Sequence, residues 1–208
     1  MASGEMTPAE FQQFLKTVFA NMAEVSLNGA VHFICMDWRH MAEVMGAAHG
    51  IYSGLKNLCV WNKNNGGTGS FYRSKHELVF VYKVGTDPHV NTIELGKNGR
   101  YRTNVWDYAG VNTCRAGRDA DLEMHPTVKP TALVIDAIKD CSRRGDLVLD
   151  AGRGSAALEH AKRTLFRDGR ARQGLHPGGR HLSGCPFAAI LGAFRSARLR
   201  ALPGAAAN

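Results

Sequence analysis

Apolar residues near the start of the chain recur at helical spacing. They lie three or four positions apart along one predicted face: Phe11, Leu15, Val18, Phe19 and Met22. The preceding segment Thr7-Pro8-Ala9-Glu10 has the spacing of a capping box, with proline at the first helical position. The pattern therefore predicts an amphipathic helix over residues 7–24.

Three short apolar runs predict strands, because they are rich in β-branched and aromatic residues. These runs are residues 30–36, 58–61 and 77–82. The first ends at Asp37, which is placed to cap a helix through Val44. Residues 62–70 consist largely of glycine and asparagine, and this composition predicts a loop between the second and third runs.

A polar stretch from Lys83 to Met124 contains few apolar runs, which predicts mostly loop with short strands. A connection of this length is typical of a functional insertion. Regular patterning then returns. Residues 130–142 predict a helix with Leu133, Val134, Ala137 and Ile138 inward, and residues 147–149 predict a strand. Helix, strand, acidic residue and glycine-rich turn, in that order, are typical of an α/β fold at a nucleotide-type cofactor site.

Composition predicts one domain with a hydrophobic core, since 44% of the 208 residues are hydrophobic. The five cysteines are scattered and form no C-x-x-C pair, so neither a disulfide framework nor a zinc cluster is indicated, and we expect a cytoplasmic protein. Nine histidines show no metal-binding spacing, so we expect no metal. No apolar run approaches the roughly 18 residues of a membrane span.

The net charge of +8 comes from the end of the chain alone. Residues 1–150 hold 16 Lys+Arg and 16 Asp+Glu, whereas residues 151–208 hold 10 and 2. Residues 156–208 are dominated by Ala, Arg, Gly and Leu without sustained periodicity, which predicts an irregular basic tail. One hypothesis is that the sequence from about residue 151 or 156 is read in a shifted frame. The alternative is a natural basic tail. Sequencing of the locus distinguishes the two, because an intact glycine motif continuing in the present frame would exclude a shift.

Two segments about twenty residues apart carry the clearest chemistry. In His125-Pro126-Thr127-Val128-Lys129-Pro130, prolines stiffen a helix-entry loop, Thr127 can cap the helix, and Lys129 sits near a helix N-terminus. In residues 147–155 a strand ends at Asp150, and Gly152 and Gly154 allow close backbone approach to a ligand. Alone, the first segment is also compatible with an ordinary helix-entry loop.

Together these segments resemble the cofactor motifs of the N4/N6 DNA amino-methyltransferases, in the permuted subgroup whose cofactor segment follows the catalytic segment. The resemblance covers roughly residues 5–155. It implies a Rossmann-like AdoMet-dependent methyltransferase fold of the α/β class, S-adenosyl-L-methionine as cofactor and double-stranded DNA as partner. It also implies a set of cofactor contacts: His125, Pro126, Thr127, Lys129, Asp150, Gly152 and Gly154.

Residues 57–82 resemble the strand, loop and hairpin beside the target-base pocket of the same family. Enzymes that flip a base need aromatic faces and polar contacts near a flexible loop. The resemblance therefore implies a set of contacts to the target base or to DNA: Ser70, Phe71, Tyr72, Arg73 and His76, with Arg100 and Arg102 in the insertion at residues 83–124. Strand-edge packing and solvated surface are the alternative interpretation of these residues.

The family's catalytic tetrapeptide, [D/N/S]-P-P-[Y/F/W], is absent from the sequence, which contains no Pro-Pro pair. In the permuted order the tetrapeptide would precede Met1, so we expect a domain over residues 1–155 that is incomplete at both ends, and no catalytic residue in this chain. We also expect a marginal or aggregation-prone product, because missing strands leave apolar sheet edges uncovered. The predicted function is site-specific methylation of adenine N6 or cytosine N4 by family, in a truncated inactive copy. A non-catalytic DNA-binding remnant or pseudoenzyme is the alternative.

Overall fold

The computed structural model describes residues 6–67, 71–97, 99–110, 129–150 and 190–194. Of residues 150 and 190–194 it describes the backbone only.

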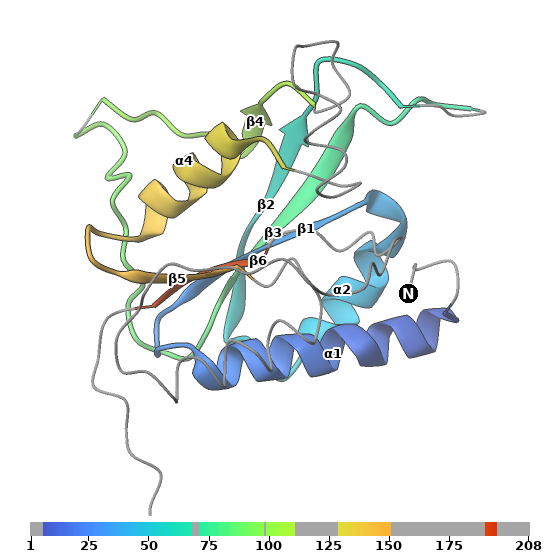
Figure 1. Ribbon diagram of the computed structural model, residues 1–208, viewed down its shortest axis with the longest axis horizontal. Helices are drawn as coiled ribbons and strands as arrows, with labels where there is room; N and C mark the ends of the chain where they lie inside the picture. The colour runs from blue at the N-terminus through green and yellow to red at the C-terminus, as the bar shows by residue number, and fades with distance from the viewer. Residues whose placement is uncertain (1–5, 68–70, 98, 111–128, 151–189, 195–208) are drawn as a thin grey trace, which may run out of the picture.

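A six-stranded mixed sheet forms the centre of the described chain (Figure 1). In spatial order the strands are β4 (Val105–Asp107), β2 (Gly54–Asn62), β3 (His76–Lys83), β1 (Val31–Met36), β6 (Ile190–Phe194) and β5 (Leu147–Asp150). Only β2 and β4 pair in parallel, and the other four neighbouring pairs are antiparallel. As a result β1, β2, β4 and β5 run in one direction, and β3 and β6 run in the other.

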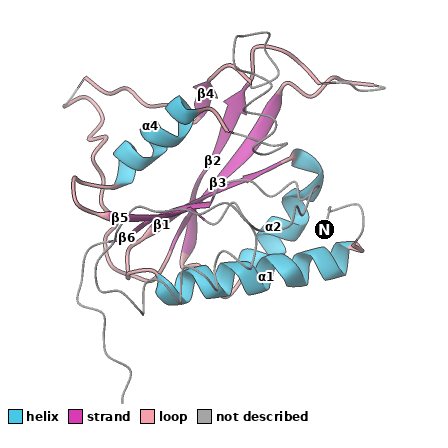
Figure 2. Cartoon of the chain, viewed as in Figure 1, coloured by secondary structure: helices cyan, strands magenta, loops and turns pink. Residues whose placement is uncertain are grey.

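Helices cover both faces of the sheet (Figure 2). α1 (Pro8–Val25) and α2 (Met41–Ala48) lie on one face, and α4 (Thr131–Cys141) lies on the other. A short 3₁₀ turn at Trp38–His40 leads from β1 into α2. The mixed α/β class expected from the sequence is confirmed.

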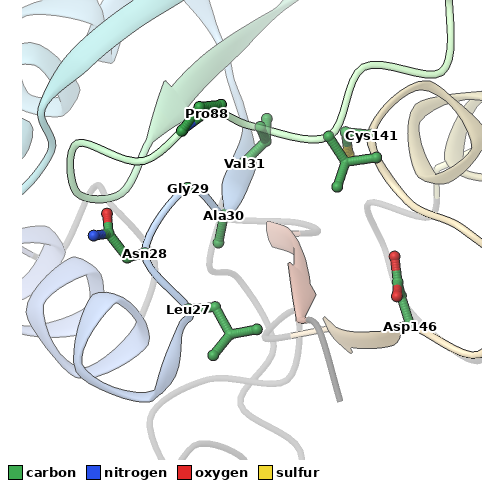
Figure 3. A pocket seen from close by; sticks show the side chains of 9 residues that line it. Leu27, Asn28, Gly29, Ala30, Val31, Pro88, Cys141 and Asp146 are labelled. Atoms are coloured by element: carbon green, nitrogen blue, oxygen red, sulfur yellow. The ribbon is translucent and has the colours of Figure 1, made fainter. Parts of the chain in front are cut away.

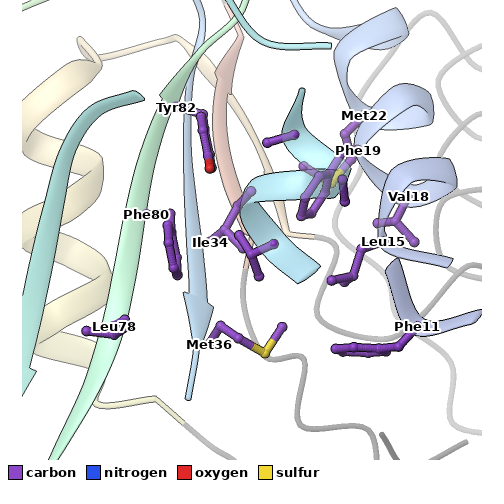
Figure 4. Close-up of a cluster of buried hydrophobic side chains, with 13 residues drawn as sticks. Phe11, Leu15, Val18, Phe19, Met22, Ile34, Met36, Leu78, Phe80 and Tyr82 are labelled. Atoms are coloured by element: carbon purple, nitrogen blue, oxygen red, sulfur yellow. The ribbon is translucent and has the colours of Figure 1, made fainter. Parts of the chain in front are cut away.

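Successive side chains of each strand point to opposite faces of the sheet, so the core consists of two layers. The layer beneath α1 and α2 takes Ile34 and Met36 from β1 and Leu78, Phe80 and Tyr82 from β3, packed against the apolar face of α1 (Figure 4). The layer beneath α4 takes the intervening strand residues together with three helix residues: Val31, Phe33, Cys35, Cys59, Trp61, Val79, Trp106, Leu133, Ala137 and Cys141.

Several elements confirm the sequence predictions closely. α1 begins after Thr7, whose side chain accepts from the backbone N–H of Glu10 at 3.3 Å, while the Glu10 carboxylate accepts from the Thr7 backbone N–H at 2.8 Å. This reciprocal capping box satisfies two N–H groups that the first helical turn leaves without partners. The strands β1, β3 and β5 and the helix α4 also lie where their apolar patterns indicate.

Three elements differ from their predictions. β2 begins at Gly54, four residues before its apolar run, because pairing with β3 extends it through exposed residues that carry no hydrophobic signal. Asp37 accepts from the backbone N–H of Arg39 at 2.9 Å and so caps the 3₁₀ turn, and α2 begins only at Met41. In the tail predicted to be irregular, residues 190–194 form β6, which pairs with both β1 and β5.

Candidate functional site

The polar ends of several strands meet at one end of the sheet. β1, β2 and β4 end at Met36, Asn62 and Asp107, and the antiparallel β3 begins beside them at His76. β5 runs in the same direction and ends at Asp150. We call this the carboxyl end of the sheet. Open α/β sheets bind nucleotide ligands outside the carboxyl ends of their strands.

A charged cluster lies at the carboxyl end on the face that α4 covers. The Glu77 carboxylate, at the start of β3, accepts from Lys63 Nζ at 3.2 Å through one oxygen and from Lys129 Nζ through the other. Both ammonium groups also lie over the Trp61 ring, 4.4 Å and 5.5 Å from its centroid. Two cations and one carboxylate leave this cluster with one positive charge in excess.

A hydrogen bond to the chain after β4 also fixes the orientation of the Trp61 ring. Its Nε1–H donates to the Tyr108 carbonyl oxygen at 2.8 Å, and the Asn62 side chain donates to Asp107 Oδ1 at 2.6 Å. Both bonds join β2 to the end of β4, because Asp107 is the last residue of β4 and Tyr108 follows it. The indole is therefore held by packing, by a hydrogen bond and by two cations at once. Trp61, Lys63 and Glu77 were not predicted as site residues, since no single motif contains all three.

The loop that connects β2 to β3 presents two aromatic rings to solvent. Phe71 and Tyr72 are 85% and 82% exposed, and their ring centroids are 4.3 Å apart. The Arg73 guanidinium turns back to donate to the carbonyl oxygens of Gly66 and Gly67, at 2.9 and 3.0 Å. Arg73 thus shapes the loop, whereas the two rings remain available to a ligand.

Trp38 is an additional aromatic residue on the same side of the molecule. Its Nε1–H donates to Ser74 Oγ at 3.1 Å, which connects the end of β1 to the β2–β3 loop. Apart from that hydrogen bond, the Trp38 side chain is exposed to solvent. In the sequence Trp38 simply follows the predicted cap Asp37, and only the structure brings it to the loop.

Arg100 and Arg102, predicted to contact DNA, form an ion-pair network with α4. Arg100 Nη2 and Arg102 Nε donate to the two oxygens of Asp140 at 2.6 and 3.1 Å. Arg102 Nη1 also donates to the Tyr108 hydroxyl at 3.1 Å, and that hydroxyl donates to Asp136 at 2.6 Å. This geometry favours a role in attaching the segment to α4. Their contact with DNA stays a prediction.

Burial is the main cause of the raised pKa values of one carboxyl group and two thiols in and near this network. Burial raises the pKa of Asp140, and the charges of Arg102 and Arg100 offset only part of that rise. Burial likewise raises the pKa of the Cys59 thiol to about 11 and that of Cys141 to about 12. Both thiols are therefore protonated at neutral pH, which makes them poor nucleophiles.

We expect Asp140→Asn to destabilise the fold by about 2 kcal/mol. The change replaces one accepting carboxylate oxygen by an NH2 group that cannot accept a hydrogen bond, so one guanidinium loses its acceptor. Both guanidinium groups are partly exposed, so the loss is smaller than for a fully buried pair. Urea denaturation monitored by tryptophan fluorescence measures the change. Glu94→Gln is the control, because its pair with Lys97 is exposed and 3.6 Å long. Equal losses in the two variants would contradict a structural role for the network.

The residues predicted to hold the cofactor lie only partly within the described ranges. Lys129 directly precedes the Pro130 cap of α4, and Asp150 ends β5, so both belong to the carboxyl end of the sheet. His76 is the first residue of β3. The remaining predicted residues lie outside the described ranges: Ser70, His125, Pro126, Thr127, Gly152 and Gly154.

A small hollow lies at the opposite end of β1 (Figure 3). It is lined by Leu27, Asn28, Gly29, Ala30, Val31, Pro88, Val90, Cys141 and Asp146. Gly29 has a φ of +90°, and a Cβ there would lie 2.7 Å from the Pro88 carbonyl oxygen, so the turn needs glycine. None of the predicted cofactor and DNA residues that the structure describes lines this hollow.

The described ranges contain neither a metal-ligand cluster nor a helix that could span a membrane. No cluster of three or more His, Cys, Asp or Glu side chains in those ranges is arranged to hold a metal ion. In the same part of the chain, every helix is too short or too polar to cross a bilayer.

Comparison with known proteins gives two matches. The family model for N6 and N4 methyltransferases, described as DNA methylase, matches residues 2–168. The Type II methyltransferase M.HpaI of Haemophilus parainfluenzae is 38% identical over 71 residues, which are 34% of this chain and 21% of that protein. The matched segment thus spans about a fifth of the length of this relative.

Proposed function

This chain belongs to the DNA methylase family of N6 and N4 methyltransferases, and we propose that it binds S-adenosyl-L-methionine and double-stranded DNA at the carboxyl end of its sheet. The proposal rests on one observation: three features lie together at this end of the sheet. They are Lys129, the end of β5 at Asp150, and the β2–β3 loop. In this proposal the mixed sheet is a Rossmann-like methyltransferase fold, with the site in its usual place for that architecture.

The residues present suit the cofactor. Asp150 ends a strand, and the sequence places Gly152 and Gly154 shortly after it, a composition that suits close backbone approach to a nucleoside. The excess positive charge of the Lys63, Glu77 and Lys129 cluster suits the cofactor's carboxylate. We assign His125, Pro126 and Thr127 to the same site from the sequence alone. When bound, the cofactor supplies an electrophilic methyl group on its sulfonium.

The β2–β3 loop is the proposed contact for DNA. Phe71 and Tyr72 offer exposed ring faces, on which unpaired bases stack irrespective of sequence. His76 begins β3 directly after the loop, and Arg73 holds the loop's shape through two carbonyl oxygens. We assign Ser70 to the same contact from the sequence alone. The exocyclic amine to be presented is that of adenine N6 or cytosine N4, the two targets of the family.

We propose further that these 208 residues do not transfer methyl groups on their own. A side-chain oxygen and a backbone carbonyl of the family tetrapeptide accept hydrogen bonds from the target amine, and its aromatic ring stacks on the flipped base. Asp87-Pro88 is the nearest match in this sequence, but His89 follows it, and the segment lies at the end of β3 remote from the carboxyl end. Orientation of the amine toward the methyl group, a large part of such catalysis, would therefore be missing.

Calorimetric titration of the full chain with S-adenosyl-L-methionine, paired with a methyl-transfer assay on unmethylated duplex DNA, tests the proposal. We expect binding without transfer. Asp150→Ala should weaken binding by about tenfold or more, because a hydrogen bond to a charged group commonly contributes 1.5–3 kcal/mol. Asp87→Ala, an exposed control, should bind as the wild type does.

Other outcomes separate the alternatives. DNA binding without cofactor binding would leave a DNA-binding remnant and exclude the proposed cofactor site. Transfer at a rate comparable to an intact methyltransferase would contradict the catalytic part of the proposal.

A further inference from the structure

Glu77 is a buried carboxylate whose two oxygens are both occupied by cations from other segments. Lys63 follows β2, and Lys129 lies 52 positions after Glu77 in the chain. The side chains of Lys129 and Glu77 are only 5% and 11% exposed. Solvent cannot replace a partner at this depth, so losing Glu77 leaves the buried Lys129 ammonium without its counter-charge.

The start of α4 lacks a local side-chain cap. Its N-cap residue is Pro130, which makes no side-chain hydrogen bond to the first turn. A helix start without such a cap depends on other contacts for its position. Lys129, directly before Pro130, supplies one by reaching Glu77 and the face of Trp61.

We infer that Glu77 and Lys129 form a positioning pair that sets where α4 begins at the carboxyl end of the sheet. This inference rests on the proposed function, because that end of the sheet is the proposed cofactor site. Lys129 then acts through Glu77 and does not touch the cofactor with its ammonium group, in contrast to the direct contact expected from the sequence. Lys63, which is more exposed, is the cation left to face an anionic ligand.

The chemistry of the pair explains why glutamate occupies this position. Glutamine has the same length but cannot neutralise two ammonium groups, so Glu77→Gln leaves Lys63 and Lys129 to repel each other. Lys129→Met keeps an unbranched apolar stem over Trp61 and removes only the charge. In Glu77→Gln/Lys129→Met no deeply buried charge remains, because Lys63 can turn to solvent.

The test compares these two single variants and the double variant with the wild type. One measurement is calorimetric affinity for S-adenosyl-L-methionine. The other is amide hydrogen exchange at residues 134–138, whose N–H groups make the first hydrogen bonds of α4, and this measurement needs no cofactor. We expect each single variant to bind about tenfold more weakly and to exchange faster at these amides. The double variant should lose no more than the worse single variant, since the two changes break one interaction.

Two controls separate positioning from general destabilisation. Glu94→Gln removes an exposed pair with Lys97 and should change neither measurement. Val18→Ala weakens the core on the opposite face of the sheet, so it should lower thermal stability without changing cofactor affinity.

Unchanged affinity and exchange in Glu77→Gln would overturn the inference, as would strictly additive losses in the double variant. If Glu77→Gln fails to fold but the double variant folds, the coupling is supported. If both fail while Lys129→Met folds with normal exchange at α4, the pair has no positioning role. A wild-type chain that binds no cofactor contradicts the proposed function, whereas the exchange measurement still decides whether the pair positions α4.

Discussion

Trp61→Ala is expected to destabilise the fold by about 3–5 kcal/mol, the range for removing a large aromatic side chain from a core. Trp61 is only 2% exposed and packs in the layer beneath α4. Its loss also removes the surface on which Lys63 and Lys129 lie. Urea denaturation followed by circular dichroism measures the change without relying on the altered tryptophan signal. The same variant should also lose cofactor binding.

Two variants separate the contributions to this effect. Trp61→Phe keeps a buried ring but leaves the Tyr108 carbonyl oxygen without its donor, so we expect a loss of about 1–2 kcal/mol. Trp38→Ala is the matched exposed control, since Trp38 is 54% exposed and should change stability by about 0.5 kcal/mol or less. Equal losses in Trp61→Ala and Trp38→Ala would contradict the buried role assigned to Trp61.

The elements that could be predicted from the sequence are those with a local signal. The capping box at Thr7 and Glu10, and the helical spacing after it, define α1 without reference to the rest of the chain. The first half of β2 has no such signal, because its side chains are exposed and only the register with β3 makes it a strand. Residues 190–194 likewise form a strand because they pair with β1 and β5.

The site was less predictable because its contacts join distant segments. A cation in a polar loop has the same appearance in a sequence whether it binds phosphate or an internal carboxylate. Arg100 and Arg102 are predicted to contact DNA, and their partner Asp140 lies on a helix 40 and 38 positions away along the chain. Lys129 was found through its motif, whereas its partner Glu77 looked like an ordinary strand residue.

His32 illustrates how a buried polar group can be fully satisfied inside the core. Ser26 Oγ donates its hydrogen to the Met22 carbonyl oxygen at 2.7 Å, so it must accept from His32 Nε2–H at 2.8 Å. The other ring nitrogen, Nδ1, then accepts from the Tyr52 hydroxyl at 2.9 Å. Both nitrogens are paired in the neutral form. A proton added to Nδ1 would reverse that bond, and the Tyr52 hydroxyl would then have to turn its own hydrogen away from the histidine.

Acidification is therefore expected to destabilise the protein by about 3 kcal/mol between pH 6.5 and pH 4, from His32 alone. Burial lowers the pKa of His32 to about 4, against an ordinary value of 6.5 in the unfolded chain. Above pH 6.5 both states are neutral and the stabilisation is complete. Below it the unfolded chain binds the proton first, so the free energy of unfolding falls until the folded histidine titrates near pH 4. Urea denaturation at half-unit steps of pH measures this slope.

His32→Gln is the variant that isolates the histidine. Its amide can still donate and accept within the same pocket, but it has no titrating group, so its stability should be lower at pH 7 and vary less between pH 6.5 and 4. His89→Gln is the comparison, because burial also lowers the pKa of His89, but that residue is less buried and should contribute a smaller slope. If His32→Gln retains the full wild-type slope, the acid sensitivity arises elsewhere, and the neutral hydrogen-bonded histidine is not its cause.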